Sequence, residues 1–413
     1  MSLGPRSSDA ASRVSRRRFL ADAGATALAA TIVKPALVRG TAANARISLG
    51  IIGTGGRGAW LGDLFRKHGG YDVVAIADYF PDRVEEAGAK LGVPADRRFT
   101  GLSAYKRLLE SKVDAVAIVS PPYFHPAQAA DAVAAGKHVY LAKPIAVDVP
   151  GCLSIEESGK KATSSKQCFL VDFQTRAMPN FVEAIRRVRA GALGTFVFGE
   201  ATYHAEDPFL EKVDAVKSGS PEGLLRGWGL SREYSGDIIT EQNIHALDVM
   251  NWIMGQPPVA ASGTGARKFR AVGTCCDTFS ITYKYAGDVG VAFSSRQFDG
   301  FGTRPEGIRN RMFGTEGVLE TEYGGQVLVR GKQFYNGGKN EDIYERGAVT
   351  NIATFHDQVT NGETSNTTVP ESVRSNLVTI LGRNAAYKGS VITWDELLKS
   401  DERMMPDVKG LKD

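Results

Sequence analysis

The chain of 413 residues is 43% hydrophobic and 23% charged, with 50 Lys and Arg against 46 Asp and Glu. This composition excludes disordered, collagen-like and small disulfide-rich proteins, and the length allows two or three domains. The net charge of +4 is uneven: residues 1–45 carry seven basic and two acidic residues (+5), which leaves 43 basic and 44 acidic residues (−1) for 46–413. A near-neutral body gives nucleic acid no basic surface, so we predict no nucleic-acid partner.

Residues 1–45 have the order of an export signal. The twin-arginine motif Ser15-Arg16-Arg17-Arg18-Phe19-Leu20 precedes a weakly apolar run at 21–33, and Ala43-Asn44-Ala45 fits a cleavage site. The apolar run is shorter than the roughly 20 residues that a membrane helix needs. We expect export of the folded protein by the twin-arginine machinery to the periplasm or another compartment outside the cytoplasm. The alternative is a basic tail with a chance arginine pair.

From residue 46 the pattern alternates short apolar strands with helices. We predict strands at 47–52, 71–77, 113–119, 137–141 and 168–173, and helices at 59–68, 81–91, 126–135 and 151–163. This alternation is typical of a doubly wound parallel sheet, so we expect an α/β domain over 46–170.

The second half has a different pattern, with alternating strands joined by glycine turns. We predict strands at 195–204, 279–285, 290–297, 309–313, 317–322 and 326–330, and helices at 181–190, 242–254, 353–360 and 370–388. A large, mostly antiparallel sheet in a second α+β domain over 171–413 follows from this pattern.

A glycine turn follows the first predicted strand. Gly53-Thr54-Gly55-Gly56-Arg57-Gly58 fits G-x-G-x-x-G and stands between a strand and a helix, the context in which this motif cradles a pyrophosphate. Asp78, 25 residues after Gly53, ends the second strand, where a carboxylate binds the adenosine ribose. The motif therefore predicts NAD, while Arg83 keeps NADP open as an alternative.

Two further loops end parallel strands and face the same crevice. Ser120-Pro121-Pro122 follows one strand and leads to His125, which either faces the dinucleotide or caps the next helix. Lys143, before Pro144, follows the next strand. We expect this lysine near the nicotinamide end of the cofactor.

Glu241 and His245 are four residues apart at the predicted helix 242–254, with Asp248 three residues further on. Side chains at this spacing share one face of a helix, and a carboxylate beside an imidazole tunes it for proton transfer. A solvent-facing ion pair is the alternative. We predict no metal site, because no dense ligand spacing is present, and buried thiols rather than a disulfide for Cys152, Cys168, Cys275 and Cys276.

Several segments together resemble the Gfo/Idh/MocA oxidoreductases. They are the turn Ile52–Gly58, the Ser120-Pro121-Pro122 segment with His125, Leu141-Ala142-Lys143-Pro144, and the stretch from Gly236 to Asp248. The closing stretches 382–387 and 393–397 extend the resemblance to nearly all of the chain after residue 46.

The resemblance implies an N-terminal Rossmann domain and a C-terminal domain with an open sheet, through which family members form dimers or tetramers. It also implies a catalytic lysine from a Glu-Lys-Pro motif, Lys143 here, and a catalytic histidine from an Asp-x-x-x-His motif, His245 here. Two positions depart from the family pattern: Ala142 replaces the glutamate of the first motif, and Glu241 replaces the aspartate of the second.

We expect hydride transfer between a sugar or polyol alcohol and NAD. His245 would take the hydroxyl proton, Lys143 would stabilise the oxygen, and Glu241 would orient His245. Weaker candidates for sugar contacts are Gln174, Arg176, Tyr203, His204 and Trp228.

Export would limit this chemistry, because no free nicotinamide pool is expected outside the cytoplasm. The cofactor would stay tightly bound, and each cycle would return it to its starting state. A sugar–sugar oxidoreductase satisfies this condition, as does an NAD-dependent glycosidase that oxidises, eliminates and re-reduces. A non-catalytic sugar-binding protein on a Rossmann scaffold is the alternative of a different class.

Overall fold

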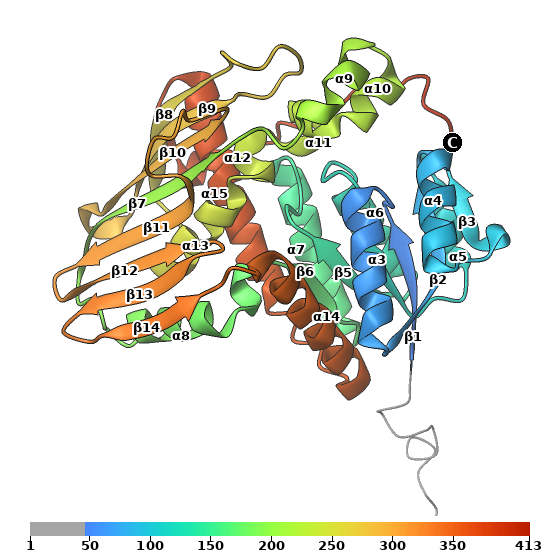
Figure 1. Ribbon diagram of the computed structural model, residues 1–413, viewed down its shortest axis with the longest axis horizontal. Helices are drawn as coiled ribbons and strands as arrows, with labels where there is room; N and C mark the ends of the chain where they lie inside the picture. Colours follow the sequence, from blue (N-terminus) through green and yellow to red (C-terminus); the bar gives the residue numbers. More distant parts are fainter. Residues whose placement is uncertain (1–45) are drawn as a thin grey trace, which may run out of the picture. The chain divides into compact units, whose positions relative to one another are not determined.

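Six short strands after residue 46 pair into one parallel sheet of order β3-β2-β1-β4-β5-β6 (Figure 1). The structure, a computed structural model, describes residues 46–413, so the predicted export signal at 1–45 lies outside the described residues. The elements of this half are β1 (Ile47–Ile52), α3 (Gly56–His68), β2 (Tyr71–Asp78), α4 (Pro81–Leu91), β3 (Arg98–Thr100), α5 (Ala104–Glu110), β4 (Ala115–Ile118), α6 (His125–Ala134), β5 (His138–Ala142), α7 (Val149–Ser164) and β6 (Phe169–Asp172).

Both faces of this sheet are covered, because its strands are apolar on both sides. Alternate residues of β1 and β4 enter two different cores, one containing Ile51 and Ala117 and the other containing Ile52 and Val116. The predicted doubly wound α/β sheet is confirmed. The sequence analysis missed β3 and α5, which are only three and seven residues long.

The second half forms a nine-stranded sheet of order β14-β13-β12-β11-β7-β10-β9-β8-β15. Only β7 and β10 pair in parallel, so the predicted mostly antiparallel sheet is confirmed. Its strands are β7 (Phe196–Ala205), β8 (Ala260–Ala266), β9 (Thr278–Lys284), β10 (Gly290–Gln297), β11 (Gly307–Gly314), β12 (Gly317–Glu322), β13 (Gln326–Gly331), β14 (Tyr335–Lys339) and β15 (Ile392–Thr393). The sequence analysis missed β8 and β14, whose glycines and small polar residues have low strand propensity.

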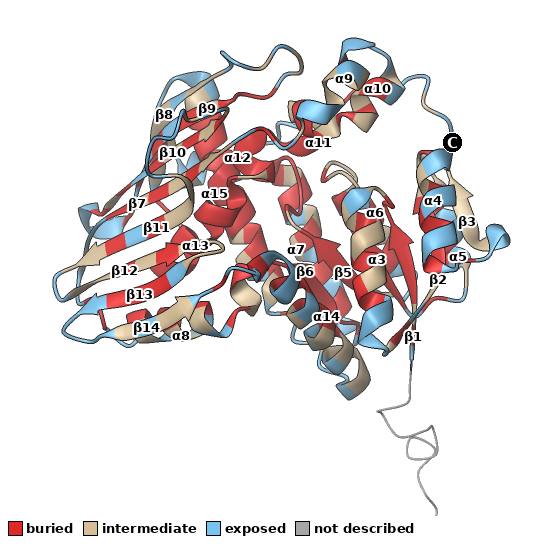
Figure 2. Cartoon of the chain, viewed as in Figure 1, coloured by how far each residue is buried: buried red, intermediate tan, exposed pale blue. Residues whose placement is uncertain are grey.

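The helices of this half are α8 (Pro179–Arg189), α9 (Val213–Lys217), α10 (Pro221–Arg226), α11 (Arg232–Ser235), α12 (Ile238–Glu241), α13 (Ile244–Met254), α14 (Ile343–Asn361), α15 (Thr368–Lys388) and α16 (Trp394–Leu398). Every residue of α13 is buried, as the red colour of this helix in Figure 2 shows. Although α13 is apolar, no helix in the described part of the chain is both long and apolar enough to cross a membrane.

Two late helices return to the parallel sheet. Ala348, Ile352 and Phe355 of α14 enter a core together with residues of α3, and α15 packs against α7 and β6. Residues 46–413 therefore pack as one unit, and the division near residue 170 stays a prediction. The structure also confirms the buried thiols, because all four cysteines are buried and free.

Candidate active site

A cleft of about 2120 Å³ follows the carboxyl edge of the parallel sheet. The loops after β1, β2, β4 and β5 line one side, and residues between 208 and 245 line the other. The predicted site residues in its lining are Gly53, Thr54, Gly55, Gly56, Arg57, Gly58, Asp78, Ser120, Pro121, Pro122, Lys143, Trp228, Glu241 and His245.

The glycine turn leaves space in the cleft where side chains would otherwise stand. Gly53 has a φ of +90° directly after β1, and α3 begins at Gly56. A Cβ atom on Gly58 would lie 1.9 Å from the carbonyl oxygen of Gly53, so the close approach of strand and helix requires glycine there. No atom lies within 4 Å of a Cβ atom built on Gly56. This cradle at a helix N-terminus fits the pyrophosphate of a dinucleotide.

Asp78 is fixed to the glycine turn by backbone hydrogen bonds. Its Oδ2 accepts a hydrogen bond from the amide of Thr54 at 2.7 Å, and its Oδ1 accepts one from the amide of Phe80 at 3.0 Å. The carboxylate therefore has a set position at the end of β2. A fixed negative charge here suits the hydroxyls of an adenosine ribose and repels a 2′-phosphate.

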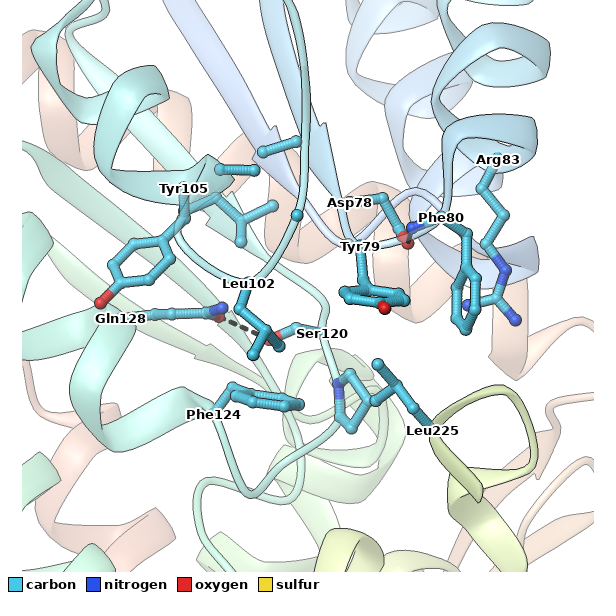
Figure 3. A pocket seen from close by; sticks show the side chains of 16 residues that line it. Asp78, Tyr79, Phe80, Arg83, Leu102, Tyr105, Ser120, Phe124, Gln128 and Leu225 are labelled. Carbon is cyan, nitrogen blue, oxygen red and sulfur yellow. Dashed lines mark hydrogen bonds between the residues drawn. The ribbon is translucent and has the colours of Figure 1, made fainter. Parts of the chain in front are cut away.

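Beside Asp78 lies a smaller pocket of about 500 Å³ with a mostly apolar lining (Figure 3). Figure 3 shows Tyr79, Phe80 and Phe124 around it, with Leu225 approaching from the second half of the chain. Flat aromatic walls next to a ribose-binding carboxylate fit an adenine ring. We call this pocket the adenosine pocket.

His125 joins the two loops that end β4 and β5. Its ring nitrogens lie 2.7 Å from the carbonyl oxygen of Ser120 and 2.8 Å from that of Pro144, and the side chain is buried behind the cleft. Burial lowers the pKa of His125 to about 4 against these two hydrogen bonds. A neutral ring has one N–H, so it donates to one carbonyl at a time. His125 is thus a positioning residue for the Lys143–Pro144 loop rather than a lining residue.

Lys143 and Glu241 form a buried pair across the cleft. Lys143 Nζ donates to the backbone carbonyl of Glu241 at 2.7 Å and lies 3.3 Å from its Oε1. Each side chain is only 8% exposed. Burial lowers the pKa of Lys143, while the Glu241 carboxylate acts in the opposite direction. The expected orientation of His245 by Glu241 is therefore wrong, because the carboxylate bonds to Lys143 and accepts a hydrogen bond from the side-chain amide of Gln242.

Glu241 does not orient His245 because the chain breaks between two helices at this point. Glu241 is the last residue of α12, and α13 begins three residues later at Ile244. Glu241 and His245 therefore do not share one continuous helix face. Asp248 also points elsewhere, since it accepts hydrogen bonds from Arg176 and from Ser375.

His245 is a buried imidazole in the wall of the cleft. Its Nδ1 forms no hydrogen bond with any described residue, and its ring lies 5.2 Å from the ring of Tyr323. Burial, and then the positive charges of Lys143 and Arg57, hold its pKa well below the ordinary value. His245 is therefore neutral near pH 7, the form that accepts a proton.

A carboxylate is present close to the position where Ala142 departs from the family pattern. Ala142 pairs with Asp172 in the register of β5 and β6, and Asp172 is fully buried. Asp172 accepts hydrogen bonds from Arg57 and from Asn351. Arg57 also donates to the hydroxyl of Tyr344 at 2.8 Å. Arg57, predicted to bind the cofactor, therefore fixes the position of the Asp172 carboxylate.

Four of the predicted sugar contacts do not line the cleft. Arg176 is bound to Asp248 at 2.8–3.0 Å and lies 5.0 Å from the ring of Trp252, so it is part of a buried ion pair. Gln174 is fully buried, with both side-chain polar atoms unpartnered among the described residues. His204 bonds to Pro305 and Ser294 beside a different cavity.

Tyr203 reaches the site indirectly, because its hydroxyl donates to Gln242, which does line the cleft.

Sequence reasoning missed other lining residues, among them Gln242, Tyr344 and Phe209. Tyr344 stacks on Trp60 of α3 at 4.9 Å although it stands at the start of α14, nearly 300 residues later in the chain. Phe209 contacts Trp228 edge to face at 5.5 Å. Gln242 was recoverable from its place beside Glu241, but the two aromatic residues stand in no recognisable motif.

Within residues 46–413 no group of three or more His, Cys, Asp or Glu residues gathers as ligands for a metal ion.

Two family models match the chain. The model described as "Oxidoreductase family, NAD-binding Rossmann fold" matches residues 47–172, and the "GFO/IDH/MocA C-terminal domain" matches residues 181–320. The first domain is therefore an NAD-binding Rossmann domain, which agrees with the cradle and the carboxylate described above.

Curated relatives match over part of their length. An inositol 2-dehydrogenase of Burkholderia cenocepacia is 28% identical over 229 residues, which cover 54% of this chain and 59% of that protein. The matched region thus spans about three fifths of that relative. A "Glycosyl hydrolase family 109 protein" of Shewanella pealeana is 28% identical over 179 residues, covering 42% of this chain and 39% of the relative.

Solved structures share the fold. The aldose-aldose oxidoreductase of Caulobacter crescentus, crystallised with glycerol, superposes with a TM-score of 0.67 at 18% identity. A levoglucosan dehydrogenase in complex with NADH and levoglucosan gives a TM-score of 0.66 at 16% identity. Each alignment covers 84% of this chain and 99% of the other.

Proposed function

We propose that this chain, which belongs to the GFO/IDH/MocA oxidoreductase family, transfers hydride between a secondary alcohol of a sugar or polyol and NAD. One observation carries the proposal: Lys143, Glu241 and the neutral His245 meet in the cleft that begins at the glycine turn. The inositol 2-dehydrogenase relative and the levoglucosan complex support a polyol or sugar as the substrate class.

The two catalytic residues would divide the work at the substrate oxygen. Lys143 has three N–H donors, and its hydrogen bonds to Glu241 leave one for the alcohol oxygen. His245 Nδ1 is buried, so Nε2 is the ring nitrogen assigned to take the hydroxyl proton. A bound NAD supplies the acceptor for the hydride that leaves the substrate carbon. Glu241 positions Lys143 and favours its charged form.

We propose further that the twin-arginine motif at 15–20 directs export, which places this reaction outside the cytoplasm. There the NAD would remain bound, and a second sugar would return it to its starting state. We favour this sugar–sugar exchange, because it allows an exported member of the family to turn over without free NAD.

The test is to purify the protein from its native compartment and record the fluorescence of bound NADH during addition of inositols and aldoses. Reduction by one compound and reoxidation by another, without net use of added NAD, is the expected result. Steady consumption of added NAD with a single sugar would contradict the closed cycle. A cofactor that responds to no sugar would favour a non-catalytic sugar-binding protein.

The substitution Lys143→Ala should lower turnover by about 10²- to 10⁴-fold, the usual contribution of a group that stabilises charge or moves a proton. NADH binding should persist, because the glycine turn and the adenosine pocket are intact. Lys160→Ala, which breaks an exposed ion pair with Glu156 within α7, is the matched control. Full activity of Lys143→Ala would refute the site assignment.

A second candidate function is an NAD-dependent glycosidase. The glycosyl hydrolase family 109 relative favours it, although the match covers only 39% of that protein. Release of nitrophenol from nitrophenyl glycosides without accumulation of NADH would select this function over sugar–sugar exchange.

We also propose a homo-oligomer that forms through the open face of the nine-stranded sheet. That face carries ion pairs between neighbouring strands, such as Arg309 with Glu322 and Arg330 with Glu320. Light scattering after gel filtration measures the mass directly, and a monomer at micromolar concentration would contradict this proposal.

A further inference from the structure

A group of large apolar side chains joins the two halves of the chain beside the adenosine pocket. Buried Phe80 of the Rossmann domain packs in one cluster with buried Leu225 and Tyr234 of the second half. The other members are Tyr79, Tyr123, Phe124, Leu224, Trp228 and Leu411. Four segments far apart in sequence therefore share this cluster, and the last of them comes from the C-terminal residues 404–413.

Polar contacts across the same boundary reach the first turn of α4 and the turn after β3. Arg226 of α10 forms two hydrogen bonds to Asp82, at 2.9 and 3.0 Å, and its guanidinium lies 4.0 Å from the centre of the Phe80 ring. On the other side, the amide of Leu102 donates to the carbonyl of Lys412 at 3.0 Å. Figure 1 shows the red C-terminal segment running from the neighbourhood of α10 towards α4 and α5.

One hydroxyl connects both segments. Tyr79 donates to Glu222 Oε1 of α10 at 2.9 Å, and it accepts from the amide of Lys412 at 3.1 Å. Its ring meanwhile lines the adenosine pocket (Figure 3). The C-terminal segment is tied down at its other end, where the amide of Met404 donates to Asp148 at 2.9 Å. We call α10 together with residues 404–413 the cover.

The cover stands over the pocket that fits the adenine ring. Leu225 of α10 and Leu102, which is bonded to the C-terminal segment, both line this pocket. A dinucleotide seated on the glycine turn would have its adenosine half beside these residues, so the closed cover would obstruct both its entry and its exit. Opening it breaks the hydrogen bonds of Tyr79 and exposes part of the apolar cluster to water.

We propose that the cover is a gate for the cofactor, and that opening of α10 and residues 404–413 sets the rate at which NAD enters and leaves. The proposal rests on the NAD binding of the proposed function and not on its sugar chemistry. A slow gate keeps one NAD in place through many turnovers, as an enzyme without a surrounding nicotinamide pool requires.

The hydroxyl of Tyr79 provides a sharp test. In Tyr79→Phe the ring stays in the pocket wall, but the bonds to Glu222 and Lys412 are lost. Two hydrogen bonds of ordinary net strength correspond to roughly a 10- to 30-fold change in the ratio of closed to open protein. NADH association and dissociation, followed by stopped-flow fluorescence, should both accelerate by about this factor. The Kd should change by less than about threefold, because a gate affects both directions.

Tyr71→Phe is the matched control for this variant. Tyr71 begins β2, the strand that Tyr79 follows, and its hydroxyl donates to the carbonyl of Ile352 at 2.8 Å, away from the cleft. The same substitution there should leave both rates unchanged. Arg226→Ala, which removes the second attachment of α10, should accelerate both rates as well, with Arg186→Ala, which breaks an exposed ion pair within α8, as its control.

The outcomes separate this proposal from the proposed function. Unchanged rates in both cover variants would overturn the gate while leaving the oxidoreductase intact. Faster dissociation alone, with a Kd weakened by the same factor, would make the Tyr79 hydroxyl an ordinary binding contact and would also overturn the gate. A wild-type protein that binds no NADH would overturn both proposals together.

Discussion

The adenosine end and the catalytic end of the cleft lie along the same edge of one sheet, yet they differ in how their polar groups are bonded. At the adenosine end, both Asp78 oxygens accept backbone hydrogen bonds, and the Tyr79 hydroxyl is bonded twice. At the catalytic end, His245 Nδ1 and both side-chain polar atoms of Asn243 are buried without a partner among residues 46–413. Asp78 and Tyr79 at the adenosine end are thus bonded internally, whereas the imidazole proposed as the base is not, although Thr54 Oγ1 and the Tyr234 hydroxyl at the adenosine end are also unpaired among the described residues.

The difference indicates that the catalytic end has a lower stability in return for polar atoms that are available to the reaction. A buried polar atom without a hydrogen bond costs about 1–3 kcal/mol. Such atoms persist where a substrate or a reaction needs them, because sequences break local rules of stability mainly at functional sites. The adenosine end would bind the part of the cofactor that does not react, so the two groups that face it, Asp78 and Tyr79, can be bonded within the protein.

The strongest challenge to this comparison is His245→Leu. Turnover should fall by about 10²- to 10³-fold, since the base is lost. The free energy of unfolding at pH 7 should stay equal or rise by about 1 kcal/mol, because an unpartnered buried polar group is replaced by an apolar one. Denaturant unfolding with steady-state rates checks both results. A loss of several kcal/mol would show that His245 stabilises the fold, and the comparison would fail.

The same variant tests a pH dependence of stability. The pKa of His245 is lowered in the folded protein, so below about pH 6.5 the unfolded chain binds a proton that the folded protein excludes. The wild-type protein should therefore lose stability as the pH falls below this value, and His245→Leu should lose less. Equal acid sensitivity of the two proteins would contradict the lowered pKa.

The substitution Glu241→Gln should lower turnover at neutral pH by about tenfold. The carboxylate opposes the effect of burial on Lys143, so its removal should lower the pKa of the lysine further below the ordinary value. The alkaline limb of the turnover profile should then move to lower pH, while the acid limb set by His245 stays. A profile of unchanged shape with uniformly lower rates would indicate that Glu241 acts only as a packing residue.

The parts of the site that sequence predicted are those in which the backbone itself demands a residue type. The glycine turn is predictable from the sequence because a side chain at Gly58 would clash with Gly53. Lys143 is predictable because it follows a strand of a recognisable parallel sheet. The sheets were predictable for a similar reason, since apolar period and turn residues follow from burial.

The failures concern contacts between distant segments. Arg176 looked like a site residue because it follows a strand that leads to the cleft, but its partners Asp248 and Glu371 stand 72 and 195 residues away. Glu241 was assigned to the wrong partner because the short break between α12 and α13 leaves no mark in the apolar pattern. The sequence does not predict the cover, because α10 has only six residues and 404–413 have no regular structure.

The smallest expected effect lies at the adenosine end, in Ser120→Ala. Ser120 donates its hydroxyl hydrogen to Gln128 at the wall of the adenosine pocket, the bond drawn as a dashed line in Figure 3. Its loss should cost about 1 kcal/mol of stability and raise the KM for NAD by a few fold, with kcat unchanged. The KM for NAD stands here for the affinity of the emptied enzyme, so a fluorescence titration with NADH, together with the turnover of the loaded enzyme, checks this. A lowered kcat would mean that this hydrogen bond also orients the catalytic end, through the Ser120 carbonyl that meets His125, and the two ends would then act as one unit.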